Sequence, residues 1–263
     1  MTASDFGAFY RPLGGDSFET SPATAGPWGS DTQHGGPASA LLVRAMERHN
    51  PVPGQRLARI TVEILRPIPL GVVTVRASTL RPGRRVTLLE ASTDVDGAEC
   101  LRARGWRVAV PDQPTPRIEP SGHPPPIPDE DNHSFWPGAY IDGYISAVAW
   151  RIAAGTMAEP GPADIWTRPR IPLVEGEQTS GFCRATVVAD SGSGISLATY
   201  PLEHAMINVD LTVVLWREPR GDWIFMSSRT IAGGEGAGLA ETALGDEGGY
   251  MGRALQTMVS ISR

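Results

Sequence analysis

The chain has 263 residues, which is enough to bury the core of one large domain or of two smaller ones. Charged residues make up 20% and hydrophobic residues 41%, and the net charge of −6 excludes a general affinity for nucleic acid or anionic membranes. No apolar run approaches the ~20 residues of a membrane-spanning helix, and the N-terminus has neither the basic nor the apolar region of a signal peptide. Cys100 and Cys183 lie apart without a CxxC motif, so we expect reduced, buried thiols in a cytoplasmic protein.

Residues 28–50 predict a long helix that follows a polar segment containing glycine. The polar segment reads DTQHGG at residues 31–36, and Pro37 suits the first helical turn because the N–H that proline lacks would have no intrahelical partner there. Apolar residues then recur at helical spacing, at Ala38, Leu41, Leu42, Ala45 and Met46. A helix N-terminus exposes unpaired N–H groups, so His34, Gly35 and Gly36 are candidate substrate-binding residues, although an ordinary N-cap gives the same pattern.

Four strand-like runs follow this helix, with no second helix between them. They span residues 59–66, 71–80, 85–95 and 99–110. Each run is rich in β-branched residues and bounded by turn residues, and Asp96-Gly97 is a typical hairpin dipeptide. We therefore predict an antiparallel meander beside one long helix.

Residues 111–138 differ in composition from the rest of the chain. Proline and polar residues dominate this stretch, which excludes a helix or a central strand. We predict a linker that crosses the surface in extended form.

The pattern then repeats in the second half. We predict strands at residues 140–153 and 163–168, a shorter helix at 175–190 closed by the SGSG sequence at 191–194, and four strands at 208–216, 222–231, 238–244 and 251–261. The order of elements and the turn positions in the two halves agree at a displacement of about 150 residues, which indicates a duplication. The predicted organisation is an N-terminal module at 1–110, a linker at 111–138 and a C-terminal module at 139–263.

The HGG-led helix, the proline-rich crossover and the second helix with its meander together resemble the TesB-type acyl-CoA thioesterases, also called acyl-CoA thioesterase II. This resemblance implies an α+β double hotdog, in which two antiparallel sheets are each wrapped around a central helix. It also implies that the protein hydrolyses fatty acyl-CoA to a free fatty acid and CoA. Asp210 matches the family's aspartate, Thr230 its catalytic serine or threonine, and Gln256 the glutamine of its last strand.

The resemblance implies a role for each matched residue. Asp210 would be the base for the attacking water or would polarise it, while Thr230 and Gln256 would hold that water in place. In a hotdog pair each helix points its N-terminus at the partner module. The helix that begins at residues 34–36 would then face the Asp210, Thr230 and Gln256 set.

Two alternatives stay open at this stage. The family's aspartate is usually followed by His and its glutamine by Glu-Gly, whereas here Leu211 follows Asp210 and Thr257-Met258 follows Gln256. These departures favour a non-catalytic acyl-CoA or lipid-binding hotdog protein. The second alternative is a hotdog enoyl-CoA hydratase or dehydratase with an Asp–His dyad, which Asp31 and His34 would imitate.

Other site types find no support in the sequence. No His, Cys and carboxylate cluster has metal-ligand spacing, and no GxSxG or Walker-type loop occurs, so we expect neither a metal nor a cofactor. The glycine-rich stretch at 233–236 lies between two predicted strands and indicates a hairpin. The expected partner is a small-molecule acyl-CoA, without nucleic acid or a membrane span, and edge strands predict a homo-oligomer.

Overall fold

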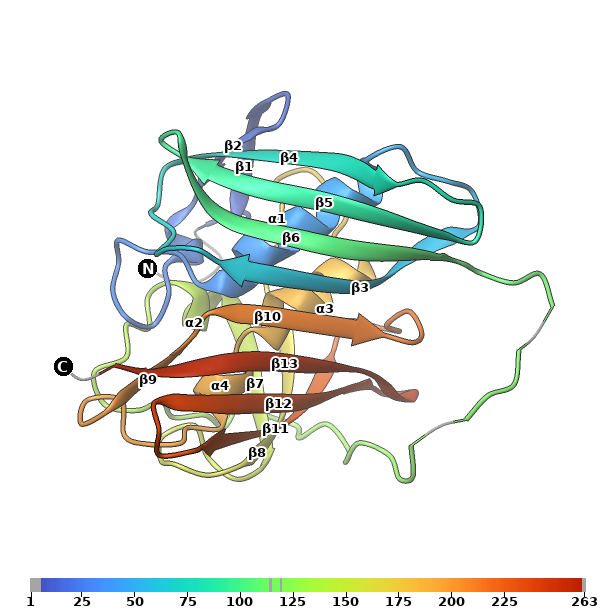
Figure 1. Ribbon diagram of the computed structural model, residues 1–263. Coiled ribbons are helices and arrows are strands. Elements are labelled where there is room, and N and C mark those ends of the chain that lie inside the picture. The colour runs from blue at the N-terminus through green and yellow to red at the C-terminus, as the bar shows by residue number, and fades with distance from the viewer. Residues whose placement is uncertain (1–5, 114, 119, 262–263) are drawn as a thin grey trace.

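A computed structural model describes residues 6–113, 115–118 and 120–261. The described chain forms two antiparallel sheets, each curled over a central helix, and the two sheets join edge to edge (Figure 1). All thirteen strands of the described residues belong to one hydrogen-bonded network, in which every strand pair is antiparallel. This is the predicted α+β double-hotdog architecture.

The first half contains the predicted helix and the four strands that follow it. These strands do not form the predicted meander, because the first of them pairs with the fourth and not with the second. The elements of this half are β1 (Tyr10–Gly14), β2 (Ser17–Thr20), a 3₁₀ turn (Pro22–Thr24), α1 (Gly35–Arg48), β3 (Gln55–Ile64), β4 (Val72–Arg81), β5 (Val86–Val95) and β6 (Ala98–Ala109). The first helix begins two residues before Pro37, because the His34 side chain caps it by accepting a hydrogen bond from the Gly36 N–H. Its apolar face, which includes Leu41, Leu42 and Met46, is buried.

The second half repeats the plan with shorter helices. Its elements are α2 (Tyr144–Ala147), β7 (Val148–Ala154), β8 (Ala163–Pro169), α3 (Gly181–Ala189), α4 (Gly192–Ile195), β9 (Ala205–Asn208), β10 (Asp210–Leu215), β11 (Ile224–Ala232), β12 (Ala237–Asp246) and β13 (Gly249–Ile261).

Three of the predicted boundaries in this half are wrong. The segment predicted as a strand at 140–153 starts with a turn and α2 before β7 begins. Helix α3 starts at Gly181 and not at residue 175, because the Ser180 hydroxyl caps it by accepting from the Cys183 N–H at 3.1 Å. The SGSG sequence at 191–194 does not close the helical region, since most of it forms α4.

The central helices lie side by side beneath the sheet and run antiparallel (Figure 1). The start of α1 meets the end of α3, and Ser180 at the start of α3 donates to Glu47 near the end of α1 at 3.1 Å. The helices meet closely at the first end because α1 begins with two glycines. A Cβ on Gly36 would lie 2.1 Å from the Val187 carbonyl oxygen, and one on Gly35 would lie 2.7 Å from a carboxylate oxygen of Asp190.

The two halves share a continuous sheet through the antiparallel pair β3 and β10. Along β10 the side chains of Leu211, Val213 and Leu215 are buried, so the alternate positions, beginning with Asp210, face outward. The described part of residues 111–138 contains no helix or strand and runs from the end of β6 around the outside of the molecule (Figure 1). None of the described helices is long and apolar enough to cross a membrane.

Candidate active site

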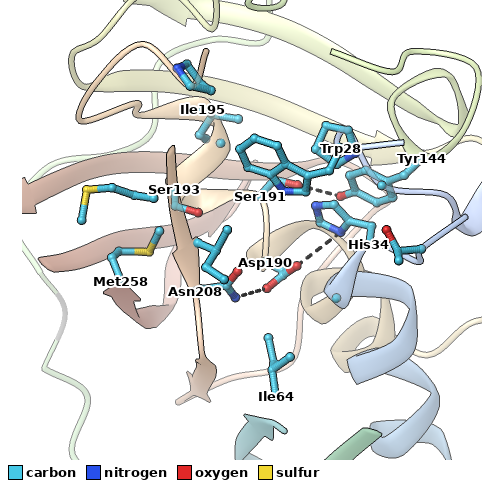
Figure 2. Close-up of a pocket in the computed structure, with 18 of the residues that line it drawn as sticks. Trp28, His34, Ile64, Tyr144, Asp190, Ser191, Ser193, Ile195, Asn208 and Met258 are labelled. Carbon is cyan, nitrogen blue, oxygen red and sulfur yellow. Dashed lines mark hydrogen bonds and ion pairs between the residues drawn. The ribbon is translucent and has the colours of Figure 1, made fainter. Parts of the chain in front are cut away.

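A cavity of about 550 Å³ lies at the end of the paired helices where α1 begins and α3 ends (Figure 2). Both halves of the chain contribute to its walls. The first half supplies residues on either side of α1's N-terminus and the segment that follows β3, and the second half supplies α2, α4, β9 and part of the linker. The position of this cavity makes the polar groups at the helix ends accessible to a ligand.

His34 is the N-cap of α1 and lines the cavity. Its Nδ1 accepts the Gly36 N–H at 3.0 Å, and its ring stacks on Tyr144 with centroids 3.7 Å apart and planes inclined by 6°. Burial lowers the pKa of His34, and the neighbouring Asp190 offsets only part of that effect. The imidazole is therefore neutral near pH 7, and because a backbone N–H can only donate, the hydrogen bond with Gly36 places the ring proton on Nε2.

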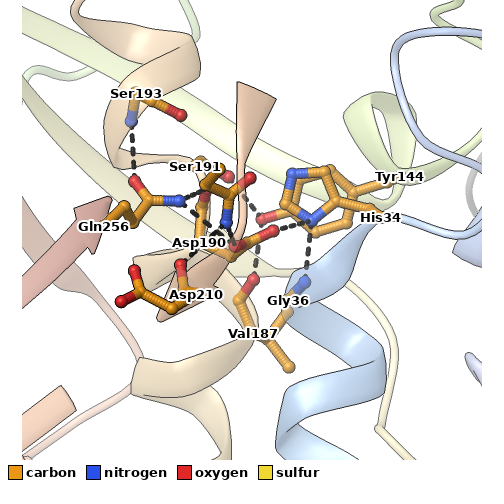
Figure 3. Close-up of polar contacts among 10 residues, drawn as sticks. His34, Gly36, Tyr144, Val187, Asp190, Ser191, Ser193, Asp210 and Gln256 are labelled. Carbon is orange, nitrogen blue, oxygen red and sulfur yellow. Dashed lines mark hydrogen bonds and ion pairs between the residues drawn. The ribbon is translucent and has the colours of Figure 1, made fainter. Parts of the chain in front are cut away.

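Asp190 follows the last residue of α3 and brings the two halves together (Figure 3). Its side chain is 5% exposed. One carboxylate oxygen accepts the Asn208 amide at 2.7 Å and the Gln256 amide at 3.2 Å, and the other lies 3.3 Å from Nδ1 of His34. The carboxylate is thus buried, and the two amide donors, Asn208 and Gln256, offset the cost of burying its charge. The neighbouring Nδ1 of His34 carries no proton and donates nothing to it.

Gln256 on β13 links Asp190 to the start of α4. It is 1% exposed, and its Nε2 donates to the Asp190 backbone carbonyl at 2.9 Å as well as to the carboxylate. Its Oε1 accepts the Ser193 N–H at 3.0 Å. Both amide protons are therefore used within the protein, and Gln256 holds the carboxylate and the α3–α4 turn in place.

Tyr144 supports this arrangement from α2. Its hydroxyl donates to the Val187 carbonyl at 2.9 Å and lies 2.8 Å from the Ser191 hydroxyl. Burial raises the pKa of Tyr144, so the phenol stays neutral. The tyrosine ring consequently offers His34 a fixed, uncharged surface on which to stack.

Three of the six sequence-predicted site residues line this cavity, and two more contact residues that line it. His34 and Gly35 line it, Gly36 bonds to the His34 ring, and Gln256 contacts Asp190. Thr230 on β11 also lines the cavity, with its hydroxyl 2.9 Å from that of Ser196.

Asp210 lies elsewhere, on the outward face of β10. Its carboxylate accepts the Thr257 N–H at 2.6 Å and the Thr257 hydroxyl at 3.0 Å. Figure 3 shows this carboxylate pointing away from His34 and Asp190, and Asp210 is not among the residues that line the cavity. The sequence predicts one strand at residues 208–216, whereas in the structure Val209 separates β9 from β10.

Sequence reasoning missed three residues of the site, Asp190, Asn208 and Tyr144. Asp190 was identified only as the end of a helix and Asn208 only as the start of a strand, and Tyr144 lay within a predicted strand. The sequence shows only that these three residues are polar and lie near the ends of helices or strands. That pattern does not indicate that their side chains meet at one site. Among the described residues, no group of three or more His, Cys, Asp or Glu side chains is arranged to hold a metal ion.

Comparisons with known families agree on both halves of the chain. Residues 24–108 match the acyl-CoA thioesterase N-terminal domain, and residues 120–260 match the acyl-CoA thioesterase C-terminal domain. No curated protein sequence matches the chain.

Similar solved structures span nearly the whole chain. A hotdog protein of unknown function from Alicyclobacillus acidocaldarius has a TM-score of 0.76 and 13% identity, covering 100% of this chain and 99% of its own. The TesB protein of Mycobacterium avium subspecies paratuberculosis has a TM-score of 0.69 and 15% identity, covering 96% of both chains. Acyl-CoA thioesterase II from Mycobacterium marinum has a TM-score of 0.67 and 14% identity, covering 97% and 95%. At these identities the likeness shows the shared fold.

Proposed function

Because the chain belongs to the acyl-CoA thioesterase family, a family of thioester hydrolases, we propose that it hydrolyses acyl-CoA thioesters in the cavity described above and that Asp190 activates the attacking water. The observation that carries this proposal is the buried Asp190 carboxylate at the junction of the two central helices, in contact with His34 and Gln256. A carboxylate held there by fixed donors has the chemistry of a general base beside a substrate cavity.

The thioester carbonyl belongs at the N-terminus of α1 in this proposal. The Gly35 N–H is the first amide of that helix and has no intrahelical acceptor, and the positive end of the helix dipole favours a developing negative charge. The Nε2–H of His34 supplies a second donor. Loss of one such donor typically lowers the rate by about 10²–10³-fold.

Asp190 then acts on the water from the other side. The water oxygen bonds to the carbonyl carbon while its proton passes to Asp190. The tetrahedral intermediate collapses, the carbon–sulfur bond breaks, and the departing CoA thiolate takes up the proton, so that Asp190 returns to its ionised state. Asn208 and Gln256 hold the carboxylate in orientation throughout.

Asp210 and Thr230 stay in the proposal as the residues that the family resemblance identifies. Thr230 lines the cavity and has a hydroxyl able to contact a bound water. Asp190 is the base in the version of the mechanism proposed here, and Asp210 is the base in the version that the family resemblance implies.

The decisive experiment compares Asp190→Asn with Asp210→Asn. Thiol release from a panel of acyl-CoA thioesters gives kcat and KM, and circular dichroism checks the fold of each variant. We expect Asp190→Asn to lower kcat by ~10²-fold or more, because an amide of the same shape accepts the Asn208 and Gln256 hydrogen bonds but cannot take a proton. Asp210→Asn should retain turnover close to that of the unmodified protein.

The reverse outcome assigns the base to Asp210. Normal turnover in both variants rejects both versions of the mechanism. The double variant is informative as well, since two residues that serve one water give effects far from additive.

The contact between His34 and Asp190 favours one second candidate, hydration of an enoyl-CoA. An Asp–His pair is the dyad expected of hotdog hydratases, and here His34 is paired with Asp190 and not with Asp31. Loss of enoyl-CoA absorbance without thiol release identifies this activity. Binding of a fluorescent acyl-CoA with neither reaction identifies the non-catalytic alternative.

A further inference from the structure

One part of the cavity lining is a wall of five aromatic side chains. Trp28, Phe135, Trp136, Tyr144 and Trp150 all line the cavity. They come from the loop before α1, the end of the linker and the continuous stretch of α2 and β7, so three separate segments of the chain contribute to one surface.

The rings of this wall contact one another in pairs. Trp28 and Trp136 have centroids 5.3 Å apart, Phe135 meets Trp150 edge to face at 5.7 Å, and Trp150 meets Tyr144 edge to face at 6.1 Å. The Trp150 indole N–H is held by the Ile145 carbonyl at 2.9 Å. These contacts keep the wall rigid, because edge-to-face and offset pairs are the favoured arrangements of aromatic side chains.

The wall begins at the proposed reaction position. Tyr144 stacks directly on His34, which lies 3.3 Å from Asp190. A group bonded to the thioester carbonyl at this position is therefore adjacent to the first ring of the wall. The rest of the lining is different in character, since it combines aliphatic side chains such as Ile195 and Leu197 with the Met258 thioether and the Thr230 hydroxyl.

An exposed arginine on the cavity lining suits the charged part of the proposed substrate. Arg66 is exposed, and it is the one cationic side chain among the described residues that line the cavity, since His34 is neutral. Guanidinium groups bind phosphate by charge-assisted hydrogen bonds. If Arg66 binds the CoA phosphates, the acyl group lies on the other side of the thioester, within the cavity.

We infer that the acyl group is one that carries a planar aromatic ring, and that the ring packs against Trp28 and Phe135, the two rings of the wall that are not buried. The buried Trp136 and Trp150 support these two rings. This inference rests on the proposed function, because it names the acyl class of the same site. Flat aromatic walls gain quadrupole contacts with an aryl ring that a saturated group of equal volume does not supply. The fatty acyl group implied by the family resemblance leads to the opposite order of substrates.

The test compares two thioesters that differ only in aromaticity, phenylacetyl-CoA and cyclohexylacetyl-CoA, together with octanoyl-CoA. We expect kcat/KM for phenylacetyl-CoA to exceed that for cyclohexylacetyl-CoA by about 3- to 10-fold, the scale of one or two aromatic contacts. It should also exceed that for octanoyl-CoA. A ratio of phenyl to cyclohexyl ester at or below 1, or faster turnover of octanoyl-CoA, overturns the inference.

Tryptophan variants show whether the wall produces the preference. Trp136→Leu and Trp28→Leu should each move the ratio toward 1. Trp28 is 44% exposed, so its replacement leaves the fold intact even where that of the buried Trp136 does not. Trp216→Leu is the matched control, because Trp216 is similarly exposed at 41%, follows β10 and lies outside the cavity. It should change neither the rate nor the ratio.

A protein that hydrolyses none of the thioesters rejects the proposed function, and the inference is then decided by binding. Isothermal titration gives Kd for phenylacetyl-CoA and cyclohexylacetyl-CoA with the unmodified protein. The aromatic site is supported if the phenyl ester binds more tightly than the cyclohexyl ester and Trp28→Leu abolishes this difference. Equal dissociation constants overturn it.

Discussion

Gly36 lets the first turn of α1 touch the last turn of α3. An alanine Cβ there would lie 2.1 Å from the Val187 carbonyl oxygen and 3.0 Å from Nδ1 of His34, so one helix must move. We predict that Gly36→Ala lowers the free energy of unfolding by about 1–3 kcal/mol, the usual cost of overpacking a tight contact. Urea denaturation followed by circular dichroism measures it.

Gly194 is the matched control for this prediction. It lies in α4, and a Cβ there would meet no atom within 4 Å. Gly194→Ala should leave the free energy of unfolding unchanged or raise it by up to about 1 kcal/mol, because alanine restricts the unfolded chain. Equal urea midpoints for the two variants would contradict the steric argument.

At the scale of elements, Asp246 fastens the loop after β10 to the β12–β13 turn. It is fully buried and accepts both Arg217 guanidinium nitrogens at 2.6 Å and the N–H groups of Arg220 and Gly248 at 2.7 Å. Burial by itself raises the pKa of Asp246, but these hydrogen bonds outweigh it, and the pKa lies below its ordinary value. The stabilisation is therefore present above the unfolded-state pKa and is lost as the pH falls through the folded-state pKa.

We predict that Asp246→Asn lowers the free energy of unfolding at pH 7 by about 3–5 kcal/mol, because it leaves the Arg217 charge without its counter-ion. Below about pH 4, the unfolded-state pKa of an aspartate, this difference should shrink. Glu241→Gln is the control, since it removes a solvent-exposed pair with Arg229 and should cost about 1 kcal/mol or less. Thermal melts between pH 2 and pH 7 test both variants, and a pH-independent difference would contradict the linkage.

At the scale of the whole molecule, a strand pair and a helix pair are among the contacts that join the halves. Strand β3 pairs with β10 over five residue pairs, with the Thr61 and Thr212 hydroxyls 3.0 Å apart, and α1 packs against α3 beneath them. We predict one cooperative unfolding transition, in which tryptophan fluorescence and far-ultraviolet circular dichroism report the same urea midpoint. Two separate midpoints would show that each half folds independently. The homo-oligomer expected from the edge strands stays a prediction.

The sequence by itself determined the repeating plan of one helix followed by four antiparallel strands. It did not determine their order in the sheet, because the first strand of each set pairs with the fourth and not with the second. Hydrophobic periodicity is a local property, so Leu41, Leu42 and Met46 identified the buried face of α1 without tertiary information. Local pattern did not determine the start of the second helix, where Ser180 as N-cap outweighs the helical appearance of residues 175–179. The HGG sequence was identified because its residues are contiguous. Gln256 was identified because it matches the last strand of the family.

Only the tertiary structure decided which carboxylate reaches the cavity. Residues 34, 190 and 208 are far apart in the sequence and meet because antiparallel helices place the start of α1 beside the end of α3. Asn208 ends β9 and lines the cavity, whereas Asp210 begins β10 and faces outward, because Val209 separates the two strands. Side chains alternate across a strand with a period of two, so a single-residue offset transfers a carboxylate from one face of a sheet to the other.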